Sequence, residues 1–282
     1  MPARETTPLA RRSLVLVPLF FALVLASWGA ALRAIAAPPA APRDVPHAPA
    51  AAARDAIEEA RRTPPRRVPA REALADERGN AIEIFPPVEP IARAPLVVVL
   101  HATCMQPGPV CARFGRAGRD GSALVCPSGN DACAGEPDWH GAPEAKRAFL
   151  ERDLALVDAR YGASVAAKGG VLVGWSRGAF AARDILDATV ARGEPSRFVG
   201  LVLIAAAVSH DAARLRRAGI ARAVFAAGDL DGARPTMQRA AARLSAAGIP
   251  SRYVSLGPIG HWLPQDLEAR MRAAIAWAAG AS

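Results

Sequence analysis

The sequence predicts an α/β fold: a mostly parallel, doubly wound sheet with helices on both faces. Short, fully apolar runs such as 95–100 and 170–174 are typical of strands buried on both faces. Between such runs lie helical patterns, as in 143–161, where apolar residues recur at i, i+4, i+7 and i+11. Alternation of strand and helix along a chain indicates parallel strands joined by crossover helices.

The regular pattern begins near residue 82. The predicted strands, in chain order, are 95–100, 122–126, 170–174, 198–205, 222–227 and 252–256. The predicted helices are 143–161, 176–192, 211–218, 234–247 and 263–279. Pro143 suits a first helical position and Gly193 suits a helix end. Ligands of such sheets bind at the carboxyl ends of the strands, so the loops that follow the strands should carry the chemistry.

The composition fits a globular chain with one or two domains. The 282 residues are 51% hydrophobic and 22% charged, with a net charge of +9. Lysine occurs only at Lys146 and Lys168, so the positive charge is nearly all arginine, and it is spread along the chain. This composition excludes collagen, coiled coil and wholesale disorder, and without a basic block it does not predict nucleic-acid binding.

Residues 1–36 are predicted to be a membrane or export segment. Three arginines precede an apolar, uncharged run from Ser13 to Leu32, which is long enough to cross a hydrocarbon core of about 30 Å. Two interpretations remain open: an uncleaved signal anchor in the cytoplasmic membrane, or a signal peptide cleaved after Ala34-Ile35-Ala36. Either one exports the domain that follows.

A linker is predicted over 37–81. The stretch 37–70 holds eight prolines with many alanines and arginines, and too few large apolar residues to pack. The sequence therefore predicts three parts: the segment 1–36, the linker 37–81 and a folded domain 82–282.

A Gly-x-Ser-x-Gly motif stands at residues 174–178, between a predicted strand and a predicted helix. In such a turn the serine backbone is strained, and the flanking glycines remove side chains that would collide. Ser176 is therefore the candidate nucleophile, with helix capping as the alternative role. It also lies at a helix N-terminus, where backbone N–H groups are free.

A serine nucleophile needs a general base and an acid that orients it. His261 follows the strand 252–256, and Asp229 and Asp231 follow the strand 222–227. The order Ser, Asp, His after strands of one sheet resembles the α/β-hydrolase family over roughly 83–281. In that family the acid usually lies three residues after a strand-ending glycine, which implies Asp231, with Asp229 as the alternative.

The resemblance also implies an oxyanion hole with two backbone N–H donors. One would be Arg177, directly after the nucleophile, and the other would be Thr103, with Ala102 as the alternative. Family members often have His-Gly where this chain has His101-Ala102, and His101 is expected to be structural. Residues 101–106 are also similar to a short motif of secreted polyester depolymerases and feruloyl esterases.

Four cysteines lie within 30 residues, and their spacing differs from zinc-binding or thioredoxin patterns. The cysteines are Cys104, Cys111, Cys126 and Cys133. With an export segment, disulfides are expected, and reduced, buried thiols are the alternative. Of the three possible connectivities, we expect Cys104–Cys111 and Cys126–Cys133, because each pair would close one loop.

The interval 206–221 is too short for the separate lid domain that many relatives insert there. The loops of 105–142 are instead expected to shape the pocket. Aromatic candidates for its lining are Trp139, His140, Trp175 and Trp262. For the tryptophans, core packing is the alternative.

The function expected from these features is hydrolysis by a Ser-His-Asp triad, with a small or polymeric carboxylic ester as the substrate. A peptidase on the same fold and an inactive binding module are the alternatives. No metal, organic cofactor or nucleic acid is implied.

Overall fold

The computed structural model of the protein describes residues 71–76 and 78–280. The predicted segment 1–36 and most of the predicted linker 37–81 lie outside the described residues. In the described part of the chain, no helix is long and apolar enough to cross a membrane.

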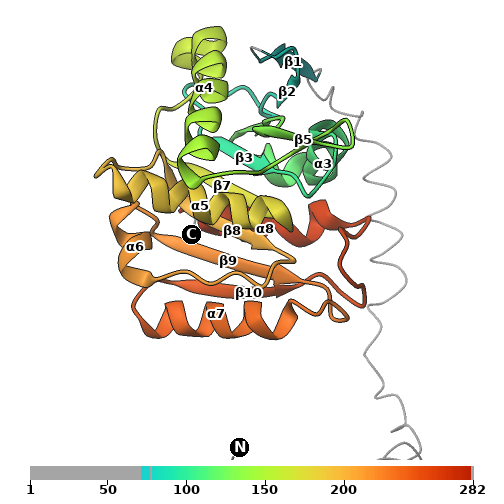
Figure 1. Cartoon of the computed structure of the whole chain (residues 1–282), viewed down its shortest axis with the longest axis vertical. Helices are drawn as coiled ribbons and strands as arrows, with labels where there is room; N and C mark the ends of the chain where they lie inside the picture. Colours follow the sequence, from blue (N-terminus) through green and yellow to red (C-terminus); the bar gives the residue numbers. More distant parts are fainter. Residues whose placement is uncertain (1–70, 77, 281–282) are drawn as a thin grey trace, which may run out of the picture. The chain divides into compact units, whose positions relative to one another are not determined.

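The described residues form an eight-stranded sheet in the order β1-β2-β4-β3-β7-β8-β9-β10 (Figure 1). Its strands are β1 (Glu72–Ala75), β2 (Ala81–Phe85), β3 (Leu96–Leu100), β4 (Ala123–Cys126), β7 (Gly170–Trp175), β8 (Phe198–Ile204), β9 (Arg222–Ala227) and β10 (Ser251–Ser255). From β4 to β10 every neighbouring pair is parallel, whereas β2 runs antiparallel to both β1 and β4. The prediction of a mostly parallel sheet is confirmed.

Helices cover both faces of this sheet. They are α3 (Pro107–Phe114), α4 (Pro143–Tyr161), α5 (Arg177–Ala191), α6 (Ala212–Arg217), α7 (Arg234–Ala246) and α8 (Leu267–Ala278). Side chains of β3 alternate between two hydrophobic clusters, as the pleat of a strand requires. One cluster contains Val98 with residues of α4 to α7, and the other contains Val97 and Val99 with residues of α3 and α8.

The predicted elements correspond to the observed ones within a few residues, and α4 and β9 have the predicted bounds. The last helix differs most, since α8 begins at Leu267 instead of Leu263. Pro264 disfavours a helical conformation at Leu263, and residues 265–266 form a turn before the helix begins. Between β8 and β9 the structure has only α6, with room for no lid domain.

Several elements were not predicted. The strand β1 falls inside the stretch 37–81 that the sequence indicated as linker, and it pairs along its whole length with β2. In 105–142, expected to be mainly loops, the chain forms α3 and a two-stranded hairpin of β5 (Asp131–Cys133) and β6 (Glu136–Asp138). Because β1, β5 and β6 are short and partly exposed, they lack the apolar runs that identify buried strands.

Two disulfides are present, but the predicted pairing is wrong. The bonds join Cys104 to Cys133 and Cys111 to Cys126, with Cα–Cα distances of 5.1 and 5.9 Å. The helix α3 carries Cys111 away from Cys104 and back over the sheet, where Cys126 at the end of β4 points to the same face. The β5–β6 hairpin returns Cys133 to the loop that holds Cys104.

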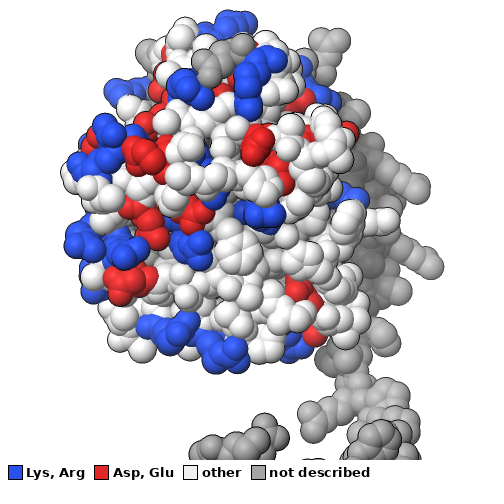
Figure 2. Space-filling model, in the orientation of Figure 1, with Lys and Arg blue, Asp and Glu red and all other residues white. Residues whose placement is uncertain are grey.

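Charges of both signs are interspersed on the face shown in Figure 2. Many charged side chains of the described residues form ion pairs. The buried Arg147, for example, contacts Glu144, Glu151 and Glu194. Arginines among the described residues are thus neutralised locally in several places.

Candidate active site

Ser176 lies on a sharp turn between β7 and α5. Its backbone has φ 52° and ψ −114°, a region that side-chain-bearing residues rarely adopt. A Cβ at Gly174 would lie 2.4 Å from the carbonyl oxygen of Gly178, and a Cβ at Gly178 would lie 2.1 Å from that of Leu100. Both glycines of the motif are therefore required by close backbone contacts, and the predicted strained turn is confirmed.

Three predicted side chains form one hydrogen-bonded line. The Ser176 Oγ lies 2.8 Å from His261 Nε2, and His261 Nδ1 lies 3.0 Å from Asp231 Oδ2. The Asp231 carboxylate is buried and also accepts a 2.8 Å hydrogen bond from the backbone N–H of Ala233. The His261 side chain is 54% exposed, so the line runs from a buried carboxylate to the surface.

The loops after β9 and β10 are held against each other by their backbones. The N–H groups of Asp229 and Leu230 donate to the carbonyl oxygens of Gly257 and Ile259. A Cβ at Gly228 would lie 2.1 Å from the Ile259 oxygen, so only glycine permits this approach. The approach brings Asp231 and His261 together at the carboxyl end of the sheet.

The structure distinguishes the two candidate acids. Asp231 contacts His261, whereas Asp229 has other partners. Asp229 Oδ1 accepts a 2.8 Å hydrogen bond from the Ser255 hydroxyl and lies 3.6 Å from Arg234.

The candidate oxyanion donors lie on the loops after β3 and β7. As the first residue of α5, Arg177 has a backbone N–H without an intrahelical acceptor. Thr103 is exposed, and its Oγ1 accepts a 3.3 Å hydrogen bond from Arg177 Nε. Alanine at position 102 imposes no strain, since the positive φ of this loop, 50°, falls on Cys104 instead.

His101, expected to be structural, is fully buried under this loop. Its ring nitrogens lie 2.7 Å from the Ala102 oxygen and 2.8 Å from the Ser128 oxygen. Burial lowers the pKa of His101, so its neutral form is favoured. The ring joins the end of β3 to the segment after β4.

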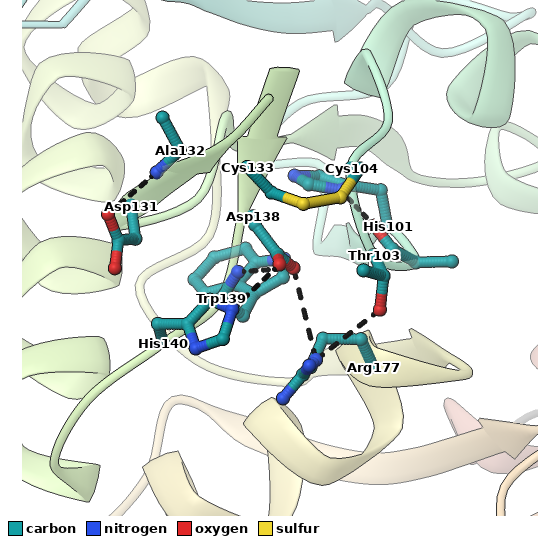
Figure 3. The surroundings of a disulfide bond; sticks show 11 residues. His101, Thr103, Cys104, Asp131, Ala132, Cys133, Asp138, Trp139, His140 and Arg177 are labelled. Carbon is teal, nitrogen blue, oxygen red and sulfur yellow. Dashed lines mark hydrogen bonds and ion pairs between the residues drawn. A yellow bond between two sulfur atoms is a disulfide. The ribbon is translucent and has the colours of Figure 1, made fainter. Parts of the chain in front are cut away.

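A polar cluster lies beside the turn and surrounds the disulfide Cys104–Cys133 (Figure 3). At its centre is Asp138, which is fully buried and accepts a 2.8 Å hydrogen bond from the backbone N–H of Trp139. His140 Nε2 lies 3.0 Å from one oxygen of Asp138, and Arg177 Nε lies 4.0 Å from the other. Figure 3 shows the Arg177 side chain directed at Asp138 and Thr103.

Of the predicted lining residues, Trp139 belongs to the core. It is fully buried and packs edge-on against Phe149, so it does not line an open site. Trp175 is also buried, beneath Trp262, with ring centroids 5.7 Å apart. Trp262 and His140 are exposed, as a lining role requires.

Leu230, which sequence reasoning missed, is 74% exposed beside Asp231, and Trp262 is 56% exposed beside His261. A large apolar residue within a turn-forming Gly-Asp-Leu-Asp stretch was the available signal. Each of these exposed apolar side chains is therefore adjacent in sequence to a residue of the hydrogen-bonded line.

The geometry permits nucleophilic chemistry. A hydroxyl bonded to an imidazole that is itself oriented by a buried carboxylate can lose its proton as it attacks an electrophile. Cys104, Cys133 and Asp138 lie close enough together to hold a metal ion, but both sulfurs are in a disulfide and are not thiolates.

Comparison with solved structures agrees with the observed topology. A ferulic acid esterase matches with a TM-score of 0.55 and 13% identity, over 75% of this chain and 97% of that one. An esterase of Pyrobaculum calidifontis matches with a TM-score of 0.51 and 18% identity, over 85% of this chain and 94% of that one. A Thermus thermophilus protein, TT1662, matches with a TM-score of 0.52 and 17% identity, over 76% of this chain and 100% of that one.

In sequence, no family model and no curated protein matches the chain. The described part of the chain has the α/β-hydrolase fold, without a separate lid domain.

Proposed function

We propose that this protein is a serine hydrolase that cleaves carboxylic esters. Ser176 Oγ attacks the acyl carbon while His261 Nε2 takes its proton, and Asp231 orients the imidazole and stabilises its charged form. The backbone N–H groups of Arg177 and Thr103 stabilise the oxyanion. His261 then protonates the departing alcohol, and water, activated by the same imidazole, releases the acid.

The observation that carries this proposal is the continuous line of hydrogen bonds from Ser176 through His261 to Asp231, at a serine with φ 52°. Strain of this kind is kept in proteins where surrounding structure holds it, and such residues gather at active sites. An ester, in preference to an amide, is supported by the structural neighbours that are described as esterases.

Labelling with a fluorophosphonate tests the proposal on the full-length chain. The probe should label the wild type and a Ser209→Ala control, an exposed serine in the loop after β8, but not Ser176→Ala. Hydrolysis of 4-nitrophenyl esters should disappear with the label. Absence of labelling in the wild type would contradict the proposal and favour a binding module. Labelling with turnover of amides but not esters would favour a peptidase.

We further propose that the domain works outside the cytoplasm. Its two disulfides favour an oxidising compartment. Fractionation of cells that express the full-length chain tests this proposal. A domain found in the cytoplasmic fraction would contradict it, and after denaturation such a domain would have four free thiols in place of the two disulfides.

A further inference from the structure

The proposed mechanism makes no use of the side chain of Arg177. The mechanism requires only its backbone N–H. Yet the guanidinium is 39% exposed beside Ser176, and its two contacts, with Thr103 Oγ1 and Asp138 Oδ1, both involve Nε. Within the described part of the chain, its Nη1 and Nη2 atoms donate no hydrogen bond.

The positive charge of Arg177 is also only weakly balanced. Among residues 71–76 and 78–280, its one acidic ion-pair partner is Asp138, which lies 4.0 Å away and already accepts a hydrogen bond from the backbone of Trp139. By contrast, Lys146 lies 2.6 Å from Asp184. Arg177 also begins the 15-residue helix α5, whose N-terminus adds positive potential.

A second nitrogen base lies on the same carboxylate. His140 Nε2 is 3.0 Å from Asp138 Oδ2, and the His140 side chain is 45% exposed. Asp138 thus lies close to both Arg177 and His140 (Figure 3), and both of these side chains are partly exposed. The disulfide Cys104–Cys133 fixes the loop of Thr103 to the hairpin that ends at Asp138.

The order of the strands decides which part of a substrate meets this cluster. Ser176 follows β7, the loop of Thr103 follows the neighbouring strand β3, and His261 follows β10 on the other side. The leaving group must lie at His261, since that residue protonates it, and the exposed apolar residues Trp262 and Leu230 directly adjoin His261 and Asp231 in the chain. The group nearest Arg177 therefore belongs to the acyl part.

We propose that Arg177, together with His140, binds a carboxylate on the acyl part of the substrate. The preferred substrates are monoesters of dicarboxylic acids with an apolar alcohol or phenol. The free Nη edge of a guanidinium matches a carboxylate through two parallel hydrogen bonds. This inference rests on the proposed function, because it names the substrate class of the same site.

Two probes of equal chain length test the inference: the mono-4-nitrophenyl ester of adipate and 4-nitrophenyl hexanoate. The ratio of their kcat/KM values should favour the adipate ester in the wild type. In Arg177→Gln the ratio should fall about tenfold, as expected for the loss of one charge-assisted pair. Arg177→Lys should recover part of this loss, because lysine keeps the positive charge but lacks the planar pair of donors that can bind a carboxylate through two hydrogen bonds.

Arg192→Gln is the matched control. It removes the same charge at the opposite end of α5, about 22 Å along the helix at 1.5 Å per residue. The ratio should stay at the wild-type value in this variant. An equal fall in both variants would mean a diffuse electrostatic effect and would overturn the proposal.

A binding measurement separates failure of the inference from failure of the proposed function. Calorimetric titration of adipate into Ser176→Ala should show binding that is lost in Ser176→Ala/Arg177→Gln. Fluorophosphonate labelling without adipate binding or adipate preference would overturn the inference and leave the hydrolase standing. Adipate binding without labelling would support the carboxylate site and overturn the hydrolase.

Discussion

At the scale of single residues, strain at Ser176 is built into the turn. A φ of 52° in a residue with a side chain costs of order 1–3 kcal/mol. The hydrogen bond from Ser176 N–H to the Ile204 oxygen, at 2.8 Å, and the contacts of Gly174 and Gly178 hold it in place. The strain exposes the hydroxyl above the end of β7, where His261 reaches it.

The two acids near His261 should differ sharply on mutation. Asp231→Asn should lower kcat by about 10³–10⁴-fold, because the amide no longer favours the correct imidazole tautomer. Asp229→Asn should change kcat little, since Asp229 bonds to Ser255 instead of His261. Steady-state hydrolysis of a 4-nitrophenyl ester measures both. The reverse result would assign the acid to Asp229.

His210 should make stability depend on pH. Burial, with a smaller effect of Arg183, lowers the pKa of His210 to about 4, and its Nε2 is buried without a hydrogen-bond partner. The unfolded chain binds the proton near pH 6.5, so this contribution to stability is complete above that pH and is lost as pH falls towards 4.

Between pH 7.5 and pH 5, the wild type should lose about 2 kcal/mol of unfolding free energy through His210. His210→Gln should lack this part of the loss, because glutamine does not titrate. Urea denaturation of both proteins at the two pH values provides the comparison. Equal losses in the two proteins would show that His210 is not responsible.

At the scale of elements, the site depends on how closely two loops approach. The loop after β9 carries Asp231, the loop after β10 carries His261, and backbone hydrogen bonds join them next to Gly228. Neither loop is regular secondary structure, so the contact between them aligns the acid and the base.

Gly228→Ala should therefore separate Asp231 from His261. Its new Cβ would lie 2.1 Å from the Ile259 oxygen, which forces the backbone to move. We expect a loss of activity of at least about 10²-fold, as small displacements of catalytic groups produce. Gly232→Ala is the control in the same loop, because its Cβ would meet nothing within 4 Å. Similar activity in both variants would refute this role of Gly228.

At the scale of the whole molecule, the two disulfides join parts that the sheet alone does not connect. Cys111–Cys126 ties α3 to β4 within the core, and Cys104–Cys133 ties the loop after β3 to the β5–β6 hairpin. The first therefore serves the packing of one face, and the second serves the candidate site.

The pair Cys111→Ser/Cys126→Ser should lower the unfolding free energy by about 3 kcal/mol, the value expected for a loop of this length. Peptide mapping of the unreduced protein should find Cys104 joined to Cys133 and Cys111 to Cys126. A change below about 1 kcal/mol, or neighbouring cysteines joined to each other, would contradict the described pairing.

Local signals in the sequence were sufficient for much of this protein. Buried parallel strands such as β3 and β7 are continuous apolar runs, and the strand–turn–helix context of Gly174 to Gly178 follows from adjacent residues. Ser176, Asp231 and His261 could be proposed together because their strands belong to one parallel sheet, whose carboxyl ends share an edge.

The tertiary structure alone decided features that depend on contacts distant in the chain. The choice of Asp231 over Asp229 as the candidate acid depends on the partners of each carboxylate, which are His261 for Asp231 and Ser255 for Asp229. The disulfide pairing depends on α3 and the β5–β6 hairpin, whose short elements carry no strong pattern. The cluster of Arg177, Asp138 and His140 joins segments that are far apart in sequence. Such contacts arise only when separate loops converge, whereas periodicity reports each segment by itself.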